Sequence, residues 1–171
     1  PIGSRGLGDV YKRQIQPNNS DENKLYDVGC AGKIIKFEET EDKRYLITLK
    51  GISRFDLISE KTNRKNFREA QVKWENFSID LQKNDTKETF TNLKISLKRY
   101  FKIKNIKVNF EVIDKCYDYN FVDQITMICP LAFEEKQLLL ETTSISKRSN
   151  LLQSIIDGYA SEENILQIVK H

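Results

Sequence analysis

The chain has 171 residues, of which 39% are hydrophobic and 31% are charged, and its formal net charge at pH 7 is +3. This composition is typical of a soluble, globular chain of one domain or slightly more. No apolar run approaches the roughly 18 residues that a membrane span needs, and the N-terminal residues lack the pattern of a secretory signal peptide. The composition therefore predicts a cytoplasmic protein without a membrane partner.

The first 14 residues differ from the rest of the chain. Asp9–Gln14 can be written in codons as GAT GTG TAT AAG AGA CAG, which resembles the mosaic-end adapter of transposon-based sequencing libraries. We therefore predict that residues 1–14 are a translated adapter and are disordered; the alternative is a genuine glycine-rich leader. The segment carries three basic residues and one acidic residue, so the remainder has a net charge of only +1. The pI of 8.7 is then no evidence for nucleic-acid binding.

The first half of the chain has the residue patterns of antiparallel β-structure. β-branched and aromatic residues alternate with polar ones between charged turns, which is the strand signature. The predicted strands are, in chain order, Tyr26–Phe37, Tyr45–Leu49, Ser53–Ile58 and Phe67–Phe77. In the last of them Trp74 would lie on the same face of the strand as Ala70 and Val72. This favours a core position for Trp74 over a role in contacting a partner.

The second half changes to a helical period. Asp85 to Glu88 resembles a helix start, and after it Leu93, Leu97, Tyr100 and Phe101 form an apolar stripe. Further helices are predicted at 121–129, 134–141, 144–158, where Gly158 would end the helix, and 161–169. We expect an α+β chain with a β subdomain at 15–80 and a helical subdomain at 81–171.

Four segments, in order, resemble the N-terminal substrate-binding domain of Lon proteases, and in particular the short bacterial proteins made only of this domain. They are Val28–Ile34, Tyr45–Phe55, Phe67–Val72 and Cys129–Leu139. The resemblance covers roughly residues 15–156. It implies a PUA-like antiparallel β pseudo-barrel followed by a C-terminal helical bundle, and five structural signature residues: Gly29, Gly51, Arg54, Phe55 and Pro130.

The chain departs from the family pattern in two places. The family's opening Phe-Pro strand and its Glu-Pro-Arg-Tyr segment are missing, so the resemblance implies an N-terminally truncated copy. Ala132-Phe133 stands where a Ser-Pro or Thr-Pro helix start is typical. If the first strands are lost, the predicted Tyr26–Phe37 strand and its partner should keep an unpaired edge and uncovered apolar side chains. We expect these to be Ile34, Ile35, Ile47 and Leu49.

The sequence contains no motif of a histidine-dependent catalytic site or of a nucleotide-binding loop. His171 is the only histidine, so neither a Ser-His-Asp site nor an HExxH metal helix is possible. There is no P-loop, and the acidic stretch at 38–42 has the pattern of a solvated turn. We expect no catalytic, cofactor-binding or metal-binding residues. The resemblance implies a non-enzymatic module that binds unfolded or degron-bearing polypeptides, with Trp74 as a candidate contact.

Two alternatives remain open. The chain could be an RNA-binding PUA-like module, or a fragment of an ATP-dependent Lon protease. The RNA alternative depends on one basic concentration, formed by Lys94, Lys98, Arg99, Lys102, Lys104 and Lys107. Tyr100 and Phe101 lie among these residues but belong to the apolar stripe, so a solvated helix face with both aromatics in the core is favoured. We therefore expect no nucleic-acid partner.

The three cysteines, Cys30, Cys116 and Cys129, are odd in number and widely spaced. Neither a CxxC zinc motif nor a disulfide framework fits them. We expect reduced thiols that behave as small hydrophobic residues.

We predict that the purified chain hydrolyses no ATP and cleaves no casein, because it lacks a P-loop and a catalytic histidine. ATP-dependent release of casein fragments by a homogeneous preparation would contradict this.

Overall fold

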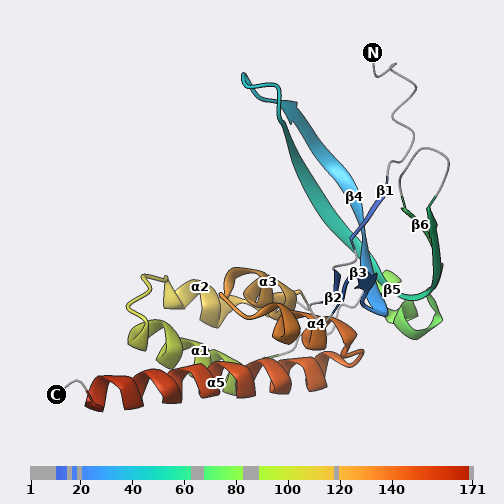
Figure 1. Ribbon diagram of the computed structural model, residues 1–171. Coiled ribbons are helices and arrows are strands. Elements are labelled where there is room, and N and C mark those ends of the chain that lie inside the picture. Colours follow the sequence, from blue (N-terminus) through green and yellow to red (C-terminus); the bar gives the residue numbers. More distant parts are fainter. Residues whose placement is uncertain are drawn as a thin grey trace. The chain divides into compact units, whose positions relative to one another are not determined.

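The computed structural model describes residues 11–14, 17–18, 21–62, 68–82, 89–117 and 120–169. The chain divides into two compact units, Pro1–Lys83 and Asn84–His171. Within the described ranges the first unit is built on β-strands and the second on α-helices (Figure 1). This confirms the predicted α+β class.

The first unit holds an antiparallel four-stranded sheet in the order β1-β4-β5-β6 and a separate two-stranded sheet of β2 and β3. A 3₁₀ segment, η1, follows the last strand. The bounds are β1 Tyr11–Gln14, β2 Pro17–Asn18, β3 Asp21–Leu25, β4 Val28–Glu39, β5 Tyr45–Thr62, β6 Arg68–Lys73 and η1 Glu75–Leu81.

Strand β5 is continuous where the sequence analysis expected two strands separated at Gly51. Gly51 lies opposite Gly32, and Ser53 lies opposite Ala31, so the intervening Ile52 is accommodated as a bulge. A bulge takes up one extra residue without ending the ladder. The register shift therefore keeps β4 and β5 paired along the whole length of β4.

Two other expectations in this unit need correction. Tyr11–Gln14, placed in a disordered segment, forms β1 and runs antiparallel to β4, with Tyr11 opposite Lys33. A strand edge offers backbone donors and acceptors that pair with any extended segment, whatever its side chains; residues 1–10 lie outside the described ranges. The strand expected to end at Phe77 ends at Lys73, because Phe77 is buried from within η1 instead.

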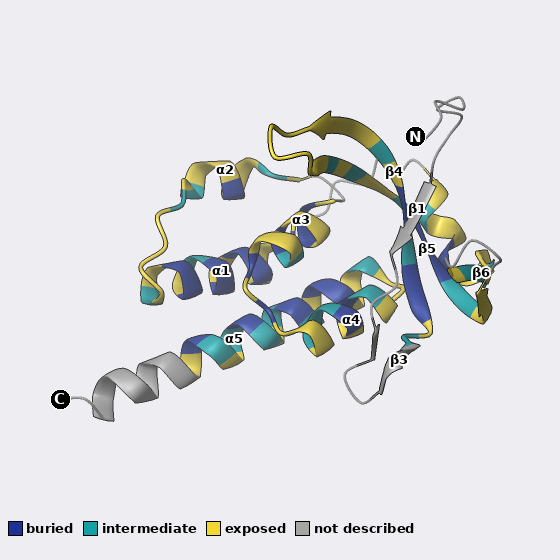
Figure 2. Ribbon diagram, turned by 45° about the horizontal axis from the view of Figure 1, so that its top comes forward, coloured by how far each residue is buried: buried dark blue, intermediate teal, exposed yellow. Residues whose placement is uncertain are grey.

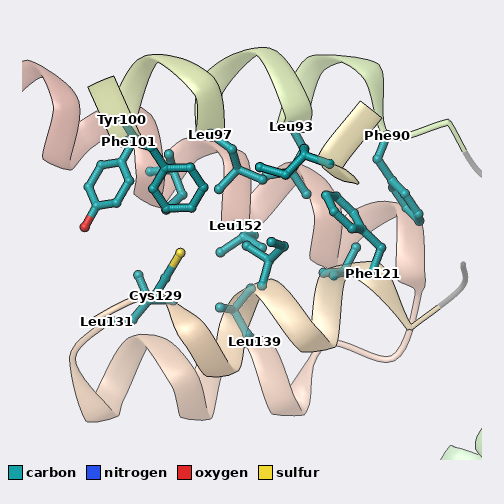
Figure 3. Close-up of a cluster of buried hydrophobic side chains, with 14 residues drawn as sticks. Phe90, Leu93, Leu97, Tyr100, Phe101, Phe121, Cys129, Leu131, Leu139 and Leu152 are labelled. Atoms are coloured by element: carbon teal, nitrogen blue, oxygen red, sulfur yellow. The ribbon is translucent and has the colours of Figure 1, made fainter. Parts of the chain in front are cut away.

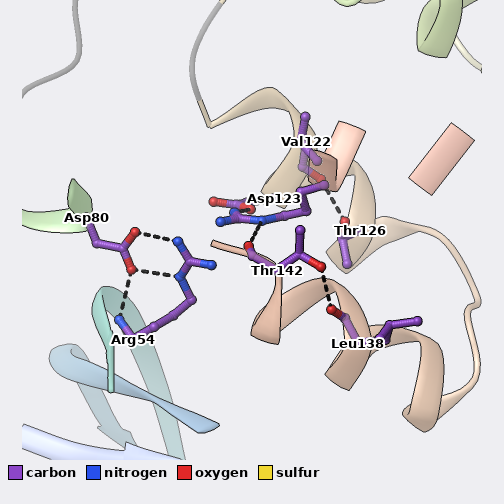
Figure 4. Close-up of polar contacts among 8 residues, drawn as sticks. Arg54, Asp80, Val122, Asp123, Thr126, Leu138 and Thr142 are labelled. Atoms are coloured by element: carbon purple, nitrogen blue, oxygen red, sulfur yellow. Dashed lines mark hydrogen bonds and ion pairs between the residues drawn. The ribbon is translucent and has the colours of Figure 1, made fainter. Parts of the chain in front are cut away.

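The polar anchor of the first unit is Arg54. Its guanidinium donates to the Asp80 carboxylate from Nε at 2.8 Å and from Nη2 at 2.7 Å, and its backbone N–H donates to the same group at 3.0 Å (Figure 4). The guanidinium also lies 4.7 Å from the centre of the Phe77 ring. Both side chains of the ion pair are largely buried, so the contact fastens η1 onto the centre of β5.

The second unit contains five helices within its described residues: α1 Thr91–Ile103, α2 Phe110–Lys115, α3 Phe121–Ile128, α4 Phe133–Glu141 and α5 Ile145–Val169. Their apolar stripes meet in one core, and the buried parts of α1 and α5 are visible in Figure 2. Figure 3 shows Leu93, Leu97 and Leu152 within it, together with Tyr100 and Phe101. The expectation that these two aromatics belong to the core is confirmed.

Helix α5 passes through Gly158, where the sequence analysis expected it to end. An interior glycine costs about 1 kcal/mol relative to alanine, but Leu152, Ile156 and Ala160 are fully buried on both sides of it. Their packing outweighs the local cost.

Helix α4 begins where the family pattern has a Ser-Pro or Thr-Pro pair. Ala132 lacks a capping hydroxyl, but its backbone N–H donates to the Glu135 carboxylate at 2.8 Å, and the Tyr159 hydroxyl donates to the same carboxylate at 2.8 Å. One carboxylate therefore completes the start of α4 and links it to α5.

We predict that Asp80→Ala lowers the free energy of unfolding by about 2–4 kcal/mol, because the buried Arg54 guanidinium and N–H lose their acceptor. Urea denaturation measures this. Asp42→Ala removes an equally charged partner of an exposed arginine and should leave the midpoint almost unchanged. Equal midpoints for the two variants would rule out the anchoring role.

Candidate functional site

The outer part of the β4–β5 pair stands apart from the rest of its sheet; we call residues 34–49 the arm. Strand β1 pairs with β4 only over Cys30–Lys33, and β6 pairs with β5 only over Asp56–Thr62. Figure 1 shows β4 and β5 continuing beyond both neighbours as a two-stranded ribbon. Among the described residues, no further strand pairs with either edge of the arm.

The arm has one apolar face, which follows from its register. Directly opposed residues in an antiparallel pair lie on the same face. Leu49 is opposite Ile34, Ile47 is opposite Phe37, and Tyr45 is opposite Glu39. The rings of Phe37 and Tyr45 stack on this face with their centres 4.9 Å apart. Five apolar side chains therefore form a continuous strip that ends at Glu39.

This strip is exposed at its outer end and half-buried nearer the base of the arm. Phe37 is 58% exposed and Tyr45 is 51% exposed, and most of the arm is coloured as exposed in Figure 2. Ile35, which bulges out of the ladder, is 58% exposed, whereas Ile34, Ile47 and Leu49 are half-buried. The expectation of uncovered apolar residues here is confirmed for Ile35 and holds in part for the other three.

The opposite face of the arm is mostly polar, with the exposed Leu46 opposite Glu38 as its apolar exception, and the turn is held by local contacts. Lys36 and Glu38 form an ion pair at 2.8 Å. At the turn, Asp42 accepts hydrogen bonds from the Arg44 guanidinium and the Thr40 hydroxyl, and these two contacts lower the pKa of its carboxyl. The described residues give Glu39 and Glu41 no such partner, so two carboxylates remain open to solvent near the strip.

Four of the predicted site residues come together at the base of the sheet in the first unit. Phe55 is completely buried opposite Gly29, next to the anchored Arg54. Trp74 packs edge-on against Phe55 with ring centres 5.5 Å apart and stays 37% exposed. Trp74 follows the end of β6 and is exposed, so it is not the buried core residue that its alternation with Ala70 and Val72 favoured, and its role in contacting a partner stays a prediction.

The other two predicted residues lie elsewhere. Gly51 faces Gly32 in the β4–β5 ladder, and a Cβ built there would meet only the Cys30 sulfur at an ordinary 3.7 Å. Pro130 is exposed in the connection between α3 and α4. A second apolar surface lies around this connection, formed by the exposed side chains of Met127, Ile128 and Phe133.

The basic concentration around α1 is largely committed to contacts within the second unit. Lys94 is buried and donates to the carbonyl oxygens of Asp114 at 3.0 Å and Cys116 at 2.6 Å. Lys98 pairs with Asp114 at 2.7 Å, and Arg99 pairs with Asp157 at 2.6 Å. Lys102 and Lys107 border an open depression between α1 and α2. Half of the six cations therefore serve packing and helix connection.

Other site chemistries find no support within the described part of the chain. No group of three or more His, Cys, Asp or Glu residues there is placed to hold a metal ion. The three cysteines are free thiols. No described helix is long and apolar enough to cross a membrane.

Sequence reasoning did not single out the aromatic pair of the arm, Leu46 or Glu39. Phe37 was assigned only to a strand, and the acidic stretch only to a turn. The available signal was the alternation of apolar residues on both sides of that turn. It reveals a shared face only once the register is known, because a shift of one residue moves every side chain to the other face.

Comparisons with known proteins identify a family and several similar solved structures, among them two Lon N-terminal domains. Residues 7–158 match the family described as the ATP-dependent protease La (LON) substrate-binding domain. A Lon N-terminal domain protein from Xanthomonas campestris is 12% identical with a TM-score of 0.55, covering 85% of this chain and 89% of that chain. The N-terminal domain of a Mycobacterium avium complex Lon protease is 12% identical with a TM-score of 0.58, covering 91% of each. The curated proteins include no match.

We predict that Cys129 resists alkylation in the folded chain. Burial raises the pKa of its thiol to about 11, although Lys136 acts in the opposite direction. At pH 8 roughly one thiol in a thousand is then ionised. Iodoacetamide at pH 8 should modify the half-buried Cys30 and Cys116 first and reach Cys129 only after unfolding in guanidinium. Equal labelling of all three in the native chain would contradict the buried placement of Cys129.

Proposed function

We propose that the chain, which belongs to the substrate-binding domain family of ATP-dependent Lon proteases, binds unfolded or degron-bearing polypeptides. The proposed action is binding alone, without a covalent step or a cofactor, and in the cytoplasm. The observation that carries the proposal is the uncovered apolar strip of the arm, which lies beside two strand edges without described partners.

The strip has the properties that unfolded polypeptide requires of a receptor. Unfolded chains expose apolar side chains together with unpaired backbone groups, whereas folded proteins hide both. The arm offers aromatic rings to the side chains and strand edges to the backbone, so one surface accommodates both features. Neither contact depends on a particular sequence, which suits a receptor for many substrates.

The size of the strip argues for a transient complex. An aromatic side chain buries about 150–250 Å² when it is fully covered. Phe37 and Tyr45 are each about half covered. Together with Ile35, and with Leu46 on the opposite face, the whole arm exposes roughly 300–500 Å² of apolar surface, so the strip itself offers less. A stable protein–protein interface needs about 800 Å² per partner, so weak and reversible binding is expected.

The two alternatives receive less support. RNA binding would need the basic concentration on α1 to be available, but Lys94, Lys98 and Arg99 have partners within the helical unit. A role as part of a complete ATP-dependent protease is compatible with the family and would use the same binding surface.

We predict that Phe37→Ser combined with Tyr45→Ser weakens binding of fluorescein-labelled unfolded casein at least about tenfold, because both rings leave the strip; tenfold corresponds to about 1.4 kcal/mol. Fluorescence anisotropy measures the affinity, and circular dichroism checks that the fold is kept.

The matched control is Met127→Ser with Ile128→Ser, which removes two apolar side chains of the helical unit that are even more exposed than Phe37 and Tyr45. This variant should bind as the unaltered chain does. If the control loses binding and the arm variant keeps it, the binding surface is the α3–α4 connection and the arm is the wrong site.

A further inference from the structure

We propose that the arm selects extended segments in which a lysine or arginine follows alternating apolar residues, and that such a segment pairs with the β4 edge and places its cation against Glu39. This inference rests on the proposed polypeptide binding and specifies its substrate class. It is carried by the position of Glu39 at the end of the apolar strip and by the adjoining β4 edge, with which no strand of the described residues pairs.

The β4 edge already accepts one antiparallel strand. Strand β1 pairs with it over Cys30–Lys33, and past the bulge at Ile35 the described residues leave the same edge without a neighbour. The stretch Lys36–Glu39 therefore presents backbone N–H and C=O groups to an incoming chain. An extended segment satisfies these groups, whereas a helix has already used its own backbone hydrogen bonds internally.

The side chains of the added strand would meet a defined row. On the apolar face β4 contributes Ile34, Phe37 and Glu39. Since side chains alternate along a strand, the residue facing Phe37 and the residue facing Glu39 are two apart in the bound segment. An apolar residue suits the first position. A cation suits the second, because the described contacts include no partner for Glu39.

Charge around the strip also favours a cation. Within the arm, Lys36 is paired with Glu38, and Arg44 is paired with Asp42. This leaves Glu39, Glu41 and Lys43 without a described ion-pair partner, and Lys43 lies in the turn and not on the strip. The unpaired charge beside the apolar row is therefore negative, and a basic segment is attracted to it while an acidic one is repelled.

A second copy of the chain is a poorer occupant. The exposed apolar area of the arm, roughly 300–500 Å² over both faces, is at or below the apolar part of the about 800 Å² that each partner of a standard-size interface buries. Two copies related by a twofold axis would also bring their Glu39 carboxylates to the ends of the same strip without supplying a cation for either.

The test uses three peptides that share one alternating apolar sequence and differ at one position, which is lysine, glutamine or glutamate. Fluorescence anisotropy with the full chain at low salt should rank them lysine, glutamine, glutamate. The lysine peptide should bind roughly three- to tenfold more tightly than the glutamate peptide. This is the range expected when an exposed ion pair is replaced by a pair of like charges. The span should narrow in 0.5 M salt, where such charges are screened.

Two variants locate the effect. Glu39→Lys should reverse the ranking, because it replaces the proposed anion of the strip by a cation. Glu41→Lys makes the same change of charge in the turn and should keep the original order. Reversal by both variants to the same extent would overturn the role of Glu39.

Backbone pairing is tested with the lysine peptide methylated on alternate amide nitrogens in either of two registers. Only one register directs its N–H groups toward β4, so one methylated peptide should lose at least about tenfold in affinity and the other should bind nearly as well as the parent. Equal losses in both registers would overturn the added-strand geometry.

The possible outcomes distinguish a failure of the charge preference from a failure of the proposed polypeptide binding. If all three peptides bind equally and unfolded casein still binds, the charge preference is wrong and the polypeptide-binding function stands. If neither peptides nor casein bind, the proposed function itself fails. A dimer seen in sedimentation that Glu39→Lys dissociates would make a second copy the occupant and overturn the inference.

Discussion

The contact between Arg54 and Asp80 fixes the part of the sheet from which the arm extends. Three hydrogen bonds join one carboxylate to the backbone and guanidinium of a single residue of β5. The backbone bond uses an edge N–H of β5 that no strand partner takes up, so η1 closes that edge at the base. Phe55 and Phe77 are then buried around the ion pair. A long two-stranded ribbon is marginal alone in water, and this base makes the arm a fixed extension of a sheet.

In the second unit the buried cations do not anchor a sheet. Instead, each of them links the ends of helices. Arg148 is buried and donates to Asp123 at 2.5 Å and to the carbonyl oxygen of Thr142 at 3.2 Å. Lys94 closes the end of α2 in the same manner. These cations are held by carbonyl groups and carboxylates inside the unit, so a basic sequence pattern here reflects helix packing. In the arm, the charged side chains without a described ion-pair partner are Glu39, Glu41 and Lys43, which leaves a net negative charge there.

The class of fold and the helical core could be predicted from the sequence because both depend on periodicity. The stripe of Leu93, Leu97, Tyr100 and Phe101 was identified as core and is buried. Other features depended on distant partners. Gly158 has the residue type of a helix end, yet its neighbours are held by the core. Ile52 becomes a bulge only because β4 lies opposite. The sequence does not distinguish Asp80 from the other acidic residues, because its role depends on Arg54 lying beside it in the fold. The apolar face of the arm likewise depends on the register of β4 and β5.

The exposed apolar surface of the arm lowers the stability of the chain but provides a surface for binding. Apolar surface left in water costs roughly 25 cal/mol per Å², so an uncovered strip of a few hundred Å² withholds several kcal/mol from the stability of the chain. A bound segment recovers that free energy, but association and the ordering of an extended peptide oppose it by about 4–15 kcal/mol. The two terms nearly cancel, which gives weak and short-lived complexes. For a module that receives many unfolded chains and must release each of them, such a balance is more useful than tight binding, and the Glu39 carboxylate adds selectivity without adding much affinity.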